Sequence, residues 1–167
     1  MGNTVGSLRK LTKRQKELGV VLINLGGSTT SMLVFEEGDP LHTAILPVGS
    51  GHITNDVAIG LRTSIDLAER LKLEFGHAQS SEVGKREDDD LAEISTEEGR
   101  ISRRQLAEII EARLVEIFNL VNKELERIDR RGMLPAGVVL TGGGAKLPGV
   151  VEVAKREFKL PASLGYP

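Results

Sequence analysis

The chain of 167 residues has 40% hydrophobic and 28% charged residues, a formal net charge of -2 and a pI near 6.0. This balance is ordinary for a globular protein, and it provides neither a basic surface for nucleic acid nor, with 3% aromatic residues, a stacking platform for single strands. The absence of cysteine excludes disulfides and thiolate sites, the 3 histidines are scattered, and no apolar run reaches the roughly 18 residues of a membrane span, so we expect a cytoplasmic protein without a metal site.

The first predicted elements are a short helix and three strands. Leucines at helical spacing indicate a helix from Leu8 to Leu18. Between Gly19 and Gly49, short apolar runs alternate with turn residues, which is typical of a meander of three strands. The turns are expected at "GGS" and "GDP".

The middle of the chain is predicted to be helical. Residues 54–56 offer an N-cap to an amphipathic stripe over residues 57–75. A second cap-like pair, Thr63 and Asp66, indicates a break into two helices, and Gly76 is a natural end.

A polar segment and a long helix complete the central region. Residues 77–100 are rich in charge and are predicted to be an exposed hairpin or a mobile insert. The strongest apolar periodicity predicts a helix from Ser102 to about Arg130. A buried strand "GVVLT", a glycine loop, a helix over residues 148–158 and a short strand near "PASLGYP" are expected to follow.

Two glycine-rich turns follow predicted strands. They are "GGSTT" at residues 26–30 and "TGGGAKLPG" at residues 141–149. In α/β proteins ligands bind beyond the carboxyl ends of strands, and glycine backbone N–H groups with threonine hydroxyls can hold phosphate. Each turn alone also fits an ordinary β-turn or strand-to-helix turn, and neither matches a dinucleotide-binding or Walker pattern. If they converge at one rim of one sheet, they form half of a nucleotide cleft.

Three motifs in this order resemble those of the actin-like ATPase superfamily, and most closely those of the FtsA family of bacterial cell-division proteins. "VVLINLGGSTTSMLVFEEG" is similar to the second phosphate motif, "LPVGSGHITNDVAIGLRTSIDLAERLKLEFG" to the following strand and helix pair, and "GVVLTGGGAKLPGV" to the adenosine motif. The resemblance extends from about Leu11 to the C-terminus. It implies an α/β fold, namely an actin-like ATPase (ribonuclease H-like) lobe with a mixed sheet and an inserted helical subdomain.

The resemblance also implies a division of the chain into parts. The expected parts are an N-terminal extension and linking helix at 1–18, a nucleotide-binding core subdomain at 19–50 and 131–167, and an inserted helical subdomain at 51–130 with a polar insert at about 77–100. The sequence before Gly19 is too short for a first phosphate hairpin, so we expect the second lobe alone, as a fragment or a truncated gene product. The C-terminal amphipathic helix through which the family attaches to membranes is likewise not expected in this sequence.

The resemblance assigns roles to particular residues. The phosphate-binding residues would be Gly26, Gly27, Ser28, Thr29 and Thr30. The ribose- and adenine-binding residues would be Glu69, Lys72, Gly142, Gly143, Gly144 and Lys146. From spacing alone, Glu69 and Lys72 also fit a surface ion pair on one helix. The implied cofactors are ATP and Mg²⁺, but Asn24 and Ser31 stand where the family has acidic residues, which weakens magnesium binding, and hydrolysis by the isolated lobe is not expected.

The implied function is ATP binding and a contribution to division-ring assembly, by polymerising and by docking the C-terminal tail of the tubulin-like division protein. Arg103, Arg104 and Arg113 are candidates for contacts with acidic groups of that tail, although an arginine on a helix is more often only solvated. The parent protein would lie on the inner face of the cell membrane at the division site.

Two alternatives remain open at this point. The first is an interaction module that no longer recognises nucleotide, which Asn24 and Ser31 favour. The second is another actin-like ATPase, such as a pilus-assembly relative or a sugar kinase. A kinase would need an acidic base for the substrate hydroxyl, and the sequence does not reveal one.

Overall fold

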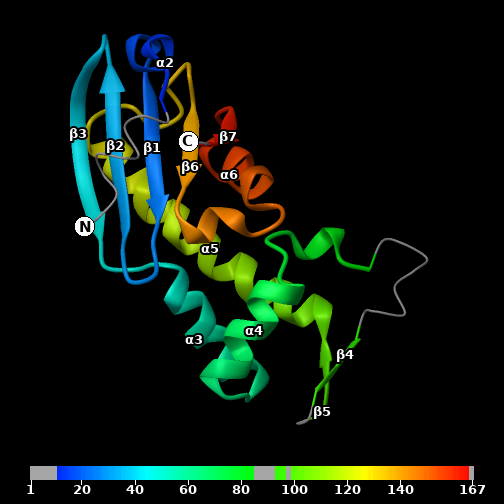
Figure 1. The fold of residues 1–167 in the computed structure, drawn as a ribbon. Coiled ribbons are helices and arrows are strands. Elements are labelled where there is room, and N and C mark those ends of the chain that lie inside the picture. Colours follow the sequence, from blue (N-terminus) through cyan, green and yellow to red (C-terminus); the bar gives the residue numbers. More distant parts are fainter. Residues whose placement is uncertain (1–10, 85–92, 97–98, 166–167) are drawn as a thin grey trace.

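A five-stranded mixed sheet forms the upper part of the molecule in Figure 1. The computed structural model describes residues 11–84, 93–96 and 99–165. The strands are β1 (Val20–Leu25), β2 (Thr30–Glu36), β3 (Asp39–Leu46), β6 (Val138–Thr141) and β7 (Ala162–Leu164). Their order across the sheet is β3-β2-β1-β6-β7.

The first three strands form the predicted antiparallel meander, and β6 and β7 add to it in parallel. The central strand β1 is buried on both faces, whereas the edge strand β3 alternates between exposed and half-buried residues. The second turn differs slightly from the expectation, because Glu37 and Gly38 have positive φ and make the turn, while Asp39 and Pro40 already pair with β2. Since β1 and β6 are parallel, their carboxyl ends lie at the same rim.

The remaining elements are helices and one small hairpin. They are α2 (Lys13–Leu18), α3 (Ser50–Leu61), α4 (Ile65–Phe75), η1 (Ser80–Glu82), β4 (Glu93–Thr96), β5 (Gly99–Ser102), α5 (Arg103–Arg127), η3 (Gly143–Lys146) and α6 (Val150–Phe158). Figure 1 shows α3 and α4 below the sheet, with α5 crossing behind it and α6 beside β6. In the ranges that the structure describes, no helix combines the length and the apolar character needed to cross a membrane.

The predicted cap at residues 54–56 is wrong, because α3 begins four residues earlier, at Ser50. The N-cap is Gly49, whose N–H donates to Nδ1 of His52 at 3.0 Å. Thr54 is therefore inside the helix and buried. The predicted break is confirmed, but the N-cap of α4 is Ser64, which accepts from the N–H of Leu67, and not the expected Thr63. The helix ends at Phe75, and Gly76 is its C-cap, as expected.

The polar segment after α4 contains a hairpin, as predicted, but its beginning is packed against the protein. Ala78 and Val83 are buried, and Ser80 donates from its N–H and its hydroxyl to Glu111 of α5 at 2.9 and 2.8 Å. The hairpin consists of β4 and β5. Residues 85–92 and 97–98 of this segment, and residues 8–10 of the expected first helix, lie outside the described ranges. Within the described residues that helix begins later than predicted, at Lys13, because Thr12 is its N-cap and accepts from the N–H of Gln15.

The main hydrophobic core lies between one face of the sheet and the helices, and it continues into the helical part. The inward residues of β1 and β2 pack there together with seven buried apolar residues of α5. Phe118 of α5 and Phe158 of α6 meet with ring centroids 5.1 Å apart. A smaller apolar cluster covers part of the opposite sheet face. The long helix α5 thus joins the sheet to α3 and α4.

Candidate functional site

The two glycine-rich turns converge at one rim of the sheet. Asn24 and Thr141 are paired across the parallel strands β1 and β6, so each turn begins at the same level. Gly142 has a φ of 91°, and a Cβ added there would lie 2.6 Å from the carbonyl oxygen of Leu25. This convergence is the geometry that the sequence predicted.

The requirement for glycine has a different structural reason at each of the three consecutive positions. A Cβ on Gly142 or on Gly144 would collide with β1, in the second case at 2.8 Å from Cβ of Leu25. Gly143, in contrast, has nothing within 4 Å of the position that its Cβ would occupy. Close packing of η3 on β1 therefore explains the outer two glycines, and only the middle one faces open space.

The first turn forms a tight hairpin whose carbonyl groups face α3. The N–H of Gly26 donates to the carbonyl of Thr29 at 3.0 Å and closes the turn. The carbonyls of Gly26 and Gly27 accept from the N–H groups of Ser50 and Gly51, at 2.7 and 2.8 Å. Exposed residues 27–29 remain available to a ligand.

Thr30 differs from the rest of the expected phosphate-binding group. It is fully buried at the start of β2, and its hydroxyl has no hydrogen-bond partner among the described residues. In this conformation its side chain does not reach a ligand at the rim.

A cavity of about 300 Å³ lies beside the glycine loop, between η3, α3 and α4. Its lining consists of Ser50, Glu69, Lys72, Leu73, Gly143, Gly144, Lys146, Leu147 and Pro148. The residues expected from the sequence to bind ribose and adenine are in this lining, except Gly142. Apolar walls with a few convergent polar groups are typical of sites for small ligands.

Four of the lining residues were not expected from the sequence: Ser50, Leu73, Leu147 and Pro148. Leu73 offers a sequence signal that could have identified it, because it is a large apolar residue next to Lys72. In the structure its side chain is 70% exposed. An exposed leucine next to expected ligand-binding residues fits an apolar wall.

Glu69 and Lys72 belong to a network that connects α4 to α3. The Lys72 side chain is buried, and Nζ donates to the carbonyl of Ser50 at 3.2 Å and to Oγ1 of Thr54 at 2.8 Å. It also forms an ion pair with Oε2 of Glu69 at 3.1 Å, and the Thr54 hydroxyl donates to the same carboxylate. The simple surface ion pair that spacing alone permits therefore does not describe this arrangement.

The network also determines the charge of Glu69. Partial burial raises the pKa of Glu69, but the hydrogen bonds from Thr54 and Lys72, together with the Lys72 charge, outweigh burial and leave the pKa below its ordinary value of 4.5. Glu69 is therefore ionised at neutral pH. An ionised carboxylate at the cavity wall accepts hydrogen bonds but donates none.

Asn24 and Ser31 lie next to each other in the β1–β2 register. Both line a small cavity of about 60 Å³ on the sheet face that turns away from the main core. Within the described ranges, no group of three or more His, Cys, Asp or Glu residues is placed to hold a metal ion. Asn24 and Ser31 offer a cation only neutral oxygens.

The three arginines singled out from the sequence lie in different environments. Arg113 makes a two-point ion pair with Asp56 of α3, with one contact, Nη2 to Oδ1, of 2.9 Å. Arg104 is exposed and approaches Glu108 at 3.5 Å on its own helix. Arg103 is half-buried and donates from Nε to the carbonyl of Phe75 at 3.4 Å.

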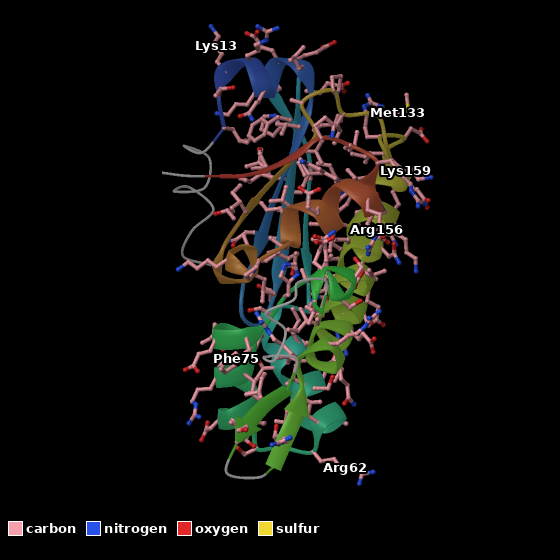
Figure 2. All side chains as sticks on the ribbon, turned by 90° about the vertical axis from the view of Figure 1, so that its right-hand side faces the viewer. Lys13, Arg62, Phe75, Met133, Arg156 and Lys159 are labelled. Carbon is pink, nitrogen blue, oxygen red and sulfur yellow. The ribbon has the colours of Figure 1, made fainter. Side chains whose placement is uncertain are left out.

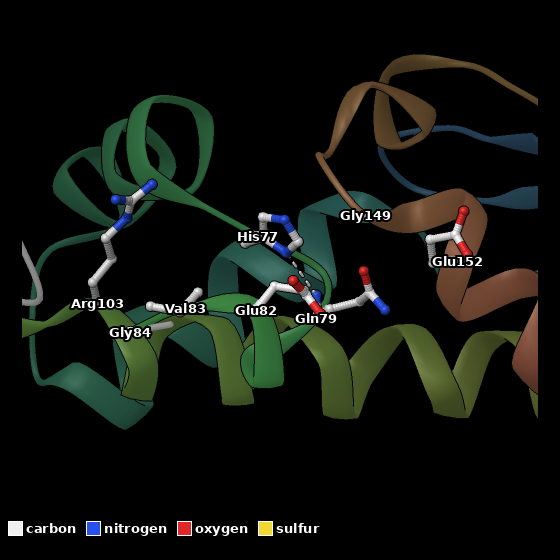
Figure 3. A pocket seen from close by; sticks show the side chains of 8 residues that line it. All are labelled: His77, Gln79, Glu82, Val83, Gly84, Arg103, Gly149 and Glu152. Atoms are coloured by element: carbon white, nitrogen blue, oxygen red, sulfur yellow. Dashed lines mark hydrogen bonds between the residues drawn. The ribbon is translucent and has the colours of Figure 1, made fainter. Parts of the chain in front are cut away.

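Arg103 also lines a second cavity, of about 650 Å³, which is shown in Figure 3. The other lining residues are His77, Gln79, Glu82, Val83, Gly84, Gly149 and Glu152. Burial lowers the pKa of His77 below its ordinary value, so the ring is neutral at neutral pH, and its Nδ1 accepts from the N–H of Gln79 at 2.9 Å. The cavity thus combines a guanidinium with amide, imidazole and carboxylate groups.

The fold is that of an actin-like ATPase lobe. MreB5 of Spiroplasma citri bound to ADP is similar with a TM-score of 0.73 and 20% identity, over 96% of this chain and 52% of that one. The PilM-PilN type IV pilus biogenesis complex gives a TM-score of 0.66 and 16% identity, over 95% of this chain and 38% of that one.

The sequence comparisons define the family within this class. The family model described as "Cell division protein FtsA" matches residues 21–167, and the chain belongs to the FtsA family. It is 41% identical over 158 residues to cell division protein FtsA of Pseudomonas aeruginosa, and 42% identical over 146 residues to that of Bacillus subtilis. The matches cover 94% and 87% of this chain, but only 38% and 33% of the length of these two relatives.

Proposed function

We propose that this chain is the nucleotide-binding second lobe of an FtsA-family division protein and that it binds ATP at the rim formed by the two glycine turns. The observation that carries the proposal is the meeting of these turns at the carboxyl ends of parallel β1 and β6, beside a cavity of about 300 Å³. Two similar structures, both of MreB5, are bound to AMPPNP and to ADP, which supports a nucleotide as the ligand.

In this proposal each part of the rim has a separate role. The backbone of residues 27–29 would donate N–H groups to phosphate oxygens, since the carbonyls of the hairpin are turned toward α3. The adenosine would enter the cavity over Gly143, with the ionised Glu69 accepting from ribose hydroxyls. Residues 19–50 and 131–167 would form the nucleotide-binding core, and residues 51–130 the inserted subdomain.

The chemistry of the rim favours binding over hydrolysis. Mg²⁺ would contact the phosphates of bound ATP, and Asn24 and Ser31 would add only neutral oxygens on the protein side. An aspartate next to the phosphates could hold hydrated magnesium or orient water, and asparagine lacks the charge for either role. We therefore propose nucleotide binding without efficient turnover by this lobe alone.

Titration of the purified chain with ATP and Mg²⁺ tests the proposal. A ligand that binds only the folded state stabilises it by about 1.4 kcal/mol at a tenfold excess over Kd, which corresponds to a rise in Tm of about 3–6 °C for a chain of this size. The matched control is Gly143→Val, because its Cβ would meet nothing within 4 Å and its side chain would narrow the cavity beside η3, so the rise in Tm with ATP should be smaller. A flat response of the unmodified chain at millimolar ATP would favour the nucleotide-independent interaction module.

We propose that polymerisation uses the two ends of the molecule. Arg62 and Lys13 mark opposite ends in Figure 2. Ile59, three residues before Arg62 in the last turn of α3, is 78% exposed, and Met133, which Figure 2 shows toward the other end, is 66% exposed. Contact between two different surfaces generates an open filament when the rotation does not close a ring. Ile59→Glu and Met133→Glu should each reduce sedimentation of ATP-containing assemblies, and Ile45→Glu on edge strand β3 should not.

We propose Arg103 as the main contact for acidic groups of the tubulin-like protein's C-terminal tail. It lines the 650 Å³ cavity, whereas Arg113 is already engaged by Asp56. Arg103→Glu should weaken binding of a fluorescent tail peptide by about tenfold or more, as expected when a charge-assisted hydrogen bond is replaced by repulsion. Arg104→Glu is the matched charge reversal on the exposed neighbour. Unchanged affinity in Arg103→Glu would remove Arg103 from the proposal. Such docking would place the parent protein at the division site.

A further inference from the structure

Lys72 is a buried cation whose hydrogen-bonding capacity is fully used within the protein. The residue is only 5% exposed, although it lines the cavity beside the glycine loop. An ammonium group has three N–H donors. They meet the carbonyl of Ser50, Oγ1 of Thr54 and the carboxylate of Glu69. In this arrangement Lys72 has no donor left for a ribose hydroxyl or an adenine nitrogen.

The contact of Lys72 with Ser50 leads directly to the phosphate hairpin. The Ser50 carbonyl accepts from Lys72, while its N–H donates to the carbonyl of Gly26 at 2.7 Å. The next N–H, of Gly51, donates to the carbonyl of Gly27 at 2.8 Å. The first turn of α3 therefore lies between Lys72 and the hairpin and is hydrogen-bonded to both.

The backbone at the start of α3 and the backbone of the hairpin are packed so closely that neither can shift without the other. A Cβ on Gly49 would lie 2.7 Å from the carbonyl oxygen of Gly27, so the two backbones are in direct contact. A Cβ on Gly51 would lie 2.8 Å from the same oxygen. A displacement of the first turn of α3 must therefore displace the hairpin as well.

We propose that Lys72 is a positioning residue that fixes the phosphate hairpin through the first turn of α3, and that its loss weakens phosphate binding more than nucleoside binding. The inference rests on the proposed nucleotide site. It differs from the direct nucleoside contact that the family resemblance implies for this residue. Thr54 shares the role, because its hydroxyl holds both Lys72 and Glu69 in place.

Binding of ATP and of adenosine separates the two roles. Lys72→Met and Thr54→Val should each lower the affinity for ATP by about tenfold more than the affinity for adenosine, roughly the loss of one net hydrogen bond at the hairpin. Both ligands carry the ribose, so a loss at Glu69 affects both equally and cancels in this ratio. Thr54 is not itself in the cavity lining, so Thr54→Val tests the same link without removing a lining side chain. The matched control is Arg70→Met, which removes an exposed cation from the same helix. An equal loss for ATP and adenosine in Lys72→Met would overturn the inference in favour of a direct contact.

A second measurement without nucleotide distinguishes this inference from the proposed function. The N–H groups of Ser50 and Gly51 should exchange with deuterium faster in Lys72→Met and Thr54→Val than in the unmodified chain and in Arg70→Met. Thr54→Val preserves the test if Lys72→Met fails to fold. If the unmodified chain binds no ATP, the proposed function fails, but faster exchange of the Ser50 and Gly51 N–H groups in the variants would still support the positioning role of Lys72. If both variants are folded and their Ser50 and Gly51 exchange is unchanged, the positioning role is refuted.

Discussion

Gly142→Ala should destabilise the protein strongly, although the change adds only one methyl group. Gly142 has a φ of 91°, a conformation that L-residues rarely adopt, and its added Cβ would lie 2.6 Å from the carbonyl oxygen of Leu25. The neighbouring atoms belong largely to β1, which is the central strand and is buried. The Asn24 side chain, which also approaches this Cβ position, can rotate away, but neither the backbone strain nor the collision with the Leu25 carbonyl can be relieved in that way.

The size of the effect follows from these two contributions. A non-glycine residue held in an unfavourable region of φ and ψ costs about 1–3 kcal/mol, and overpacking of a buried contact costs about 1–3 kcal/mol. Their sum is about 2–6 kcal/mol, so Tm should fall by at least about 4 °C in a chain of this length. Gly143→Ala is the matched control, because nothing lies within 4 Å of its Cβ position and its stability should change by at most about 1 kcal/mol.

Thermal and urea denaturation of the two variants, followed by circular dichroism, provide the measurement. The reasoning predicts a large loss for Gly142→Ala and a small change for Gly143→Ala in the absence of any nucleotide. A Tm of Gly142→Ala within 1 °C of the unmodified chain would refute it. An equal loss in both variants would also refute it, because the two positions would then not differ in packing.

Three further predictions concern the helices. Arg113→Ala should cost about 1 kcal/mol or less, because its ion pair with Asp56 is partly exposed, and a double-mutant cycle should give a coupling that shrinks with added salt; zero coupling at low salt would contradict this. Burial raises the pKa of Glu111, but hydrogen bonds, first those from Ser80, outweigh burial and hold it below its ordinary value of 4.5. The stabilisation from Glu111 is therefore present above its unfolded-state pKa and is lost as the pH falls through the lower folded-state pKa. In urea titrations, Glu111→Gln should therefore lose less stability than the unmodified chain between about pH 5 and pH 3. An equal loss in both proteins would argue against this role of Glu111. Phe118 is fully buried, so Phe118→Ala should cost about 3–5 kcal/mol in urea denaturation and Phe118→Leu clearly less; equal losses would contradict a cavity effect.

Much of the architecture could be predicted because the apolar periodicity follows the burial that the fold imposes. The three-strand meander, the break before α4 and the long helix α5 all appear where the pattern changes. The start of α3 could not be predicted in the same way. Its first turn is held by the backbone carbonyls of Gly26 and Gly27 and by the ring of His52. The sequence pattern for a side-chain cap points to Thr54 instead, because backbone partners leave no such pattern.

In the candidate site, too, the sequence pattern predicts some features, whereas others depend on tertiary packing. The meeting of the two turns could be predicted, because parallel strands place their carboxyl ends at one rim. The separate roles of the three glycines could not, since Gly142 and Gly144 are constrained by contacts with Leu25 across the sheet. The burial of Lys72 depends on how α4 packs against α3, which helical spacing alone does not specify.

The unbroken course of α5 has a mechanical consequence. With 25 residues at about 1.5 Å each, α5 is a rod of roughly 37 Å, and its buried face takes part in a core that includes both the sheet and the helical part. Severing the chain at the boundary between these parts would leave apolar surface bare on both pieces. The two parts should therefore unfold cooperatively, and the β4–β5 hairpin, which continues directly into α5 at Arg103, should follow any movement of that end of the helix.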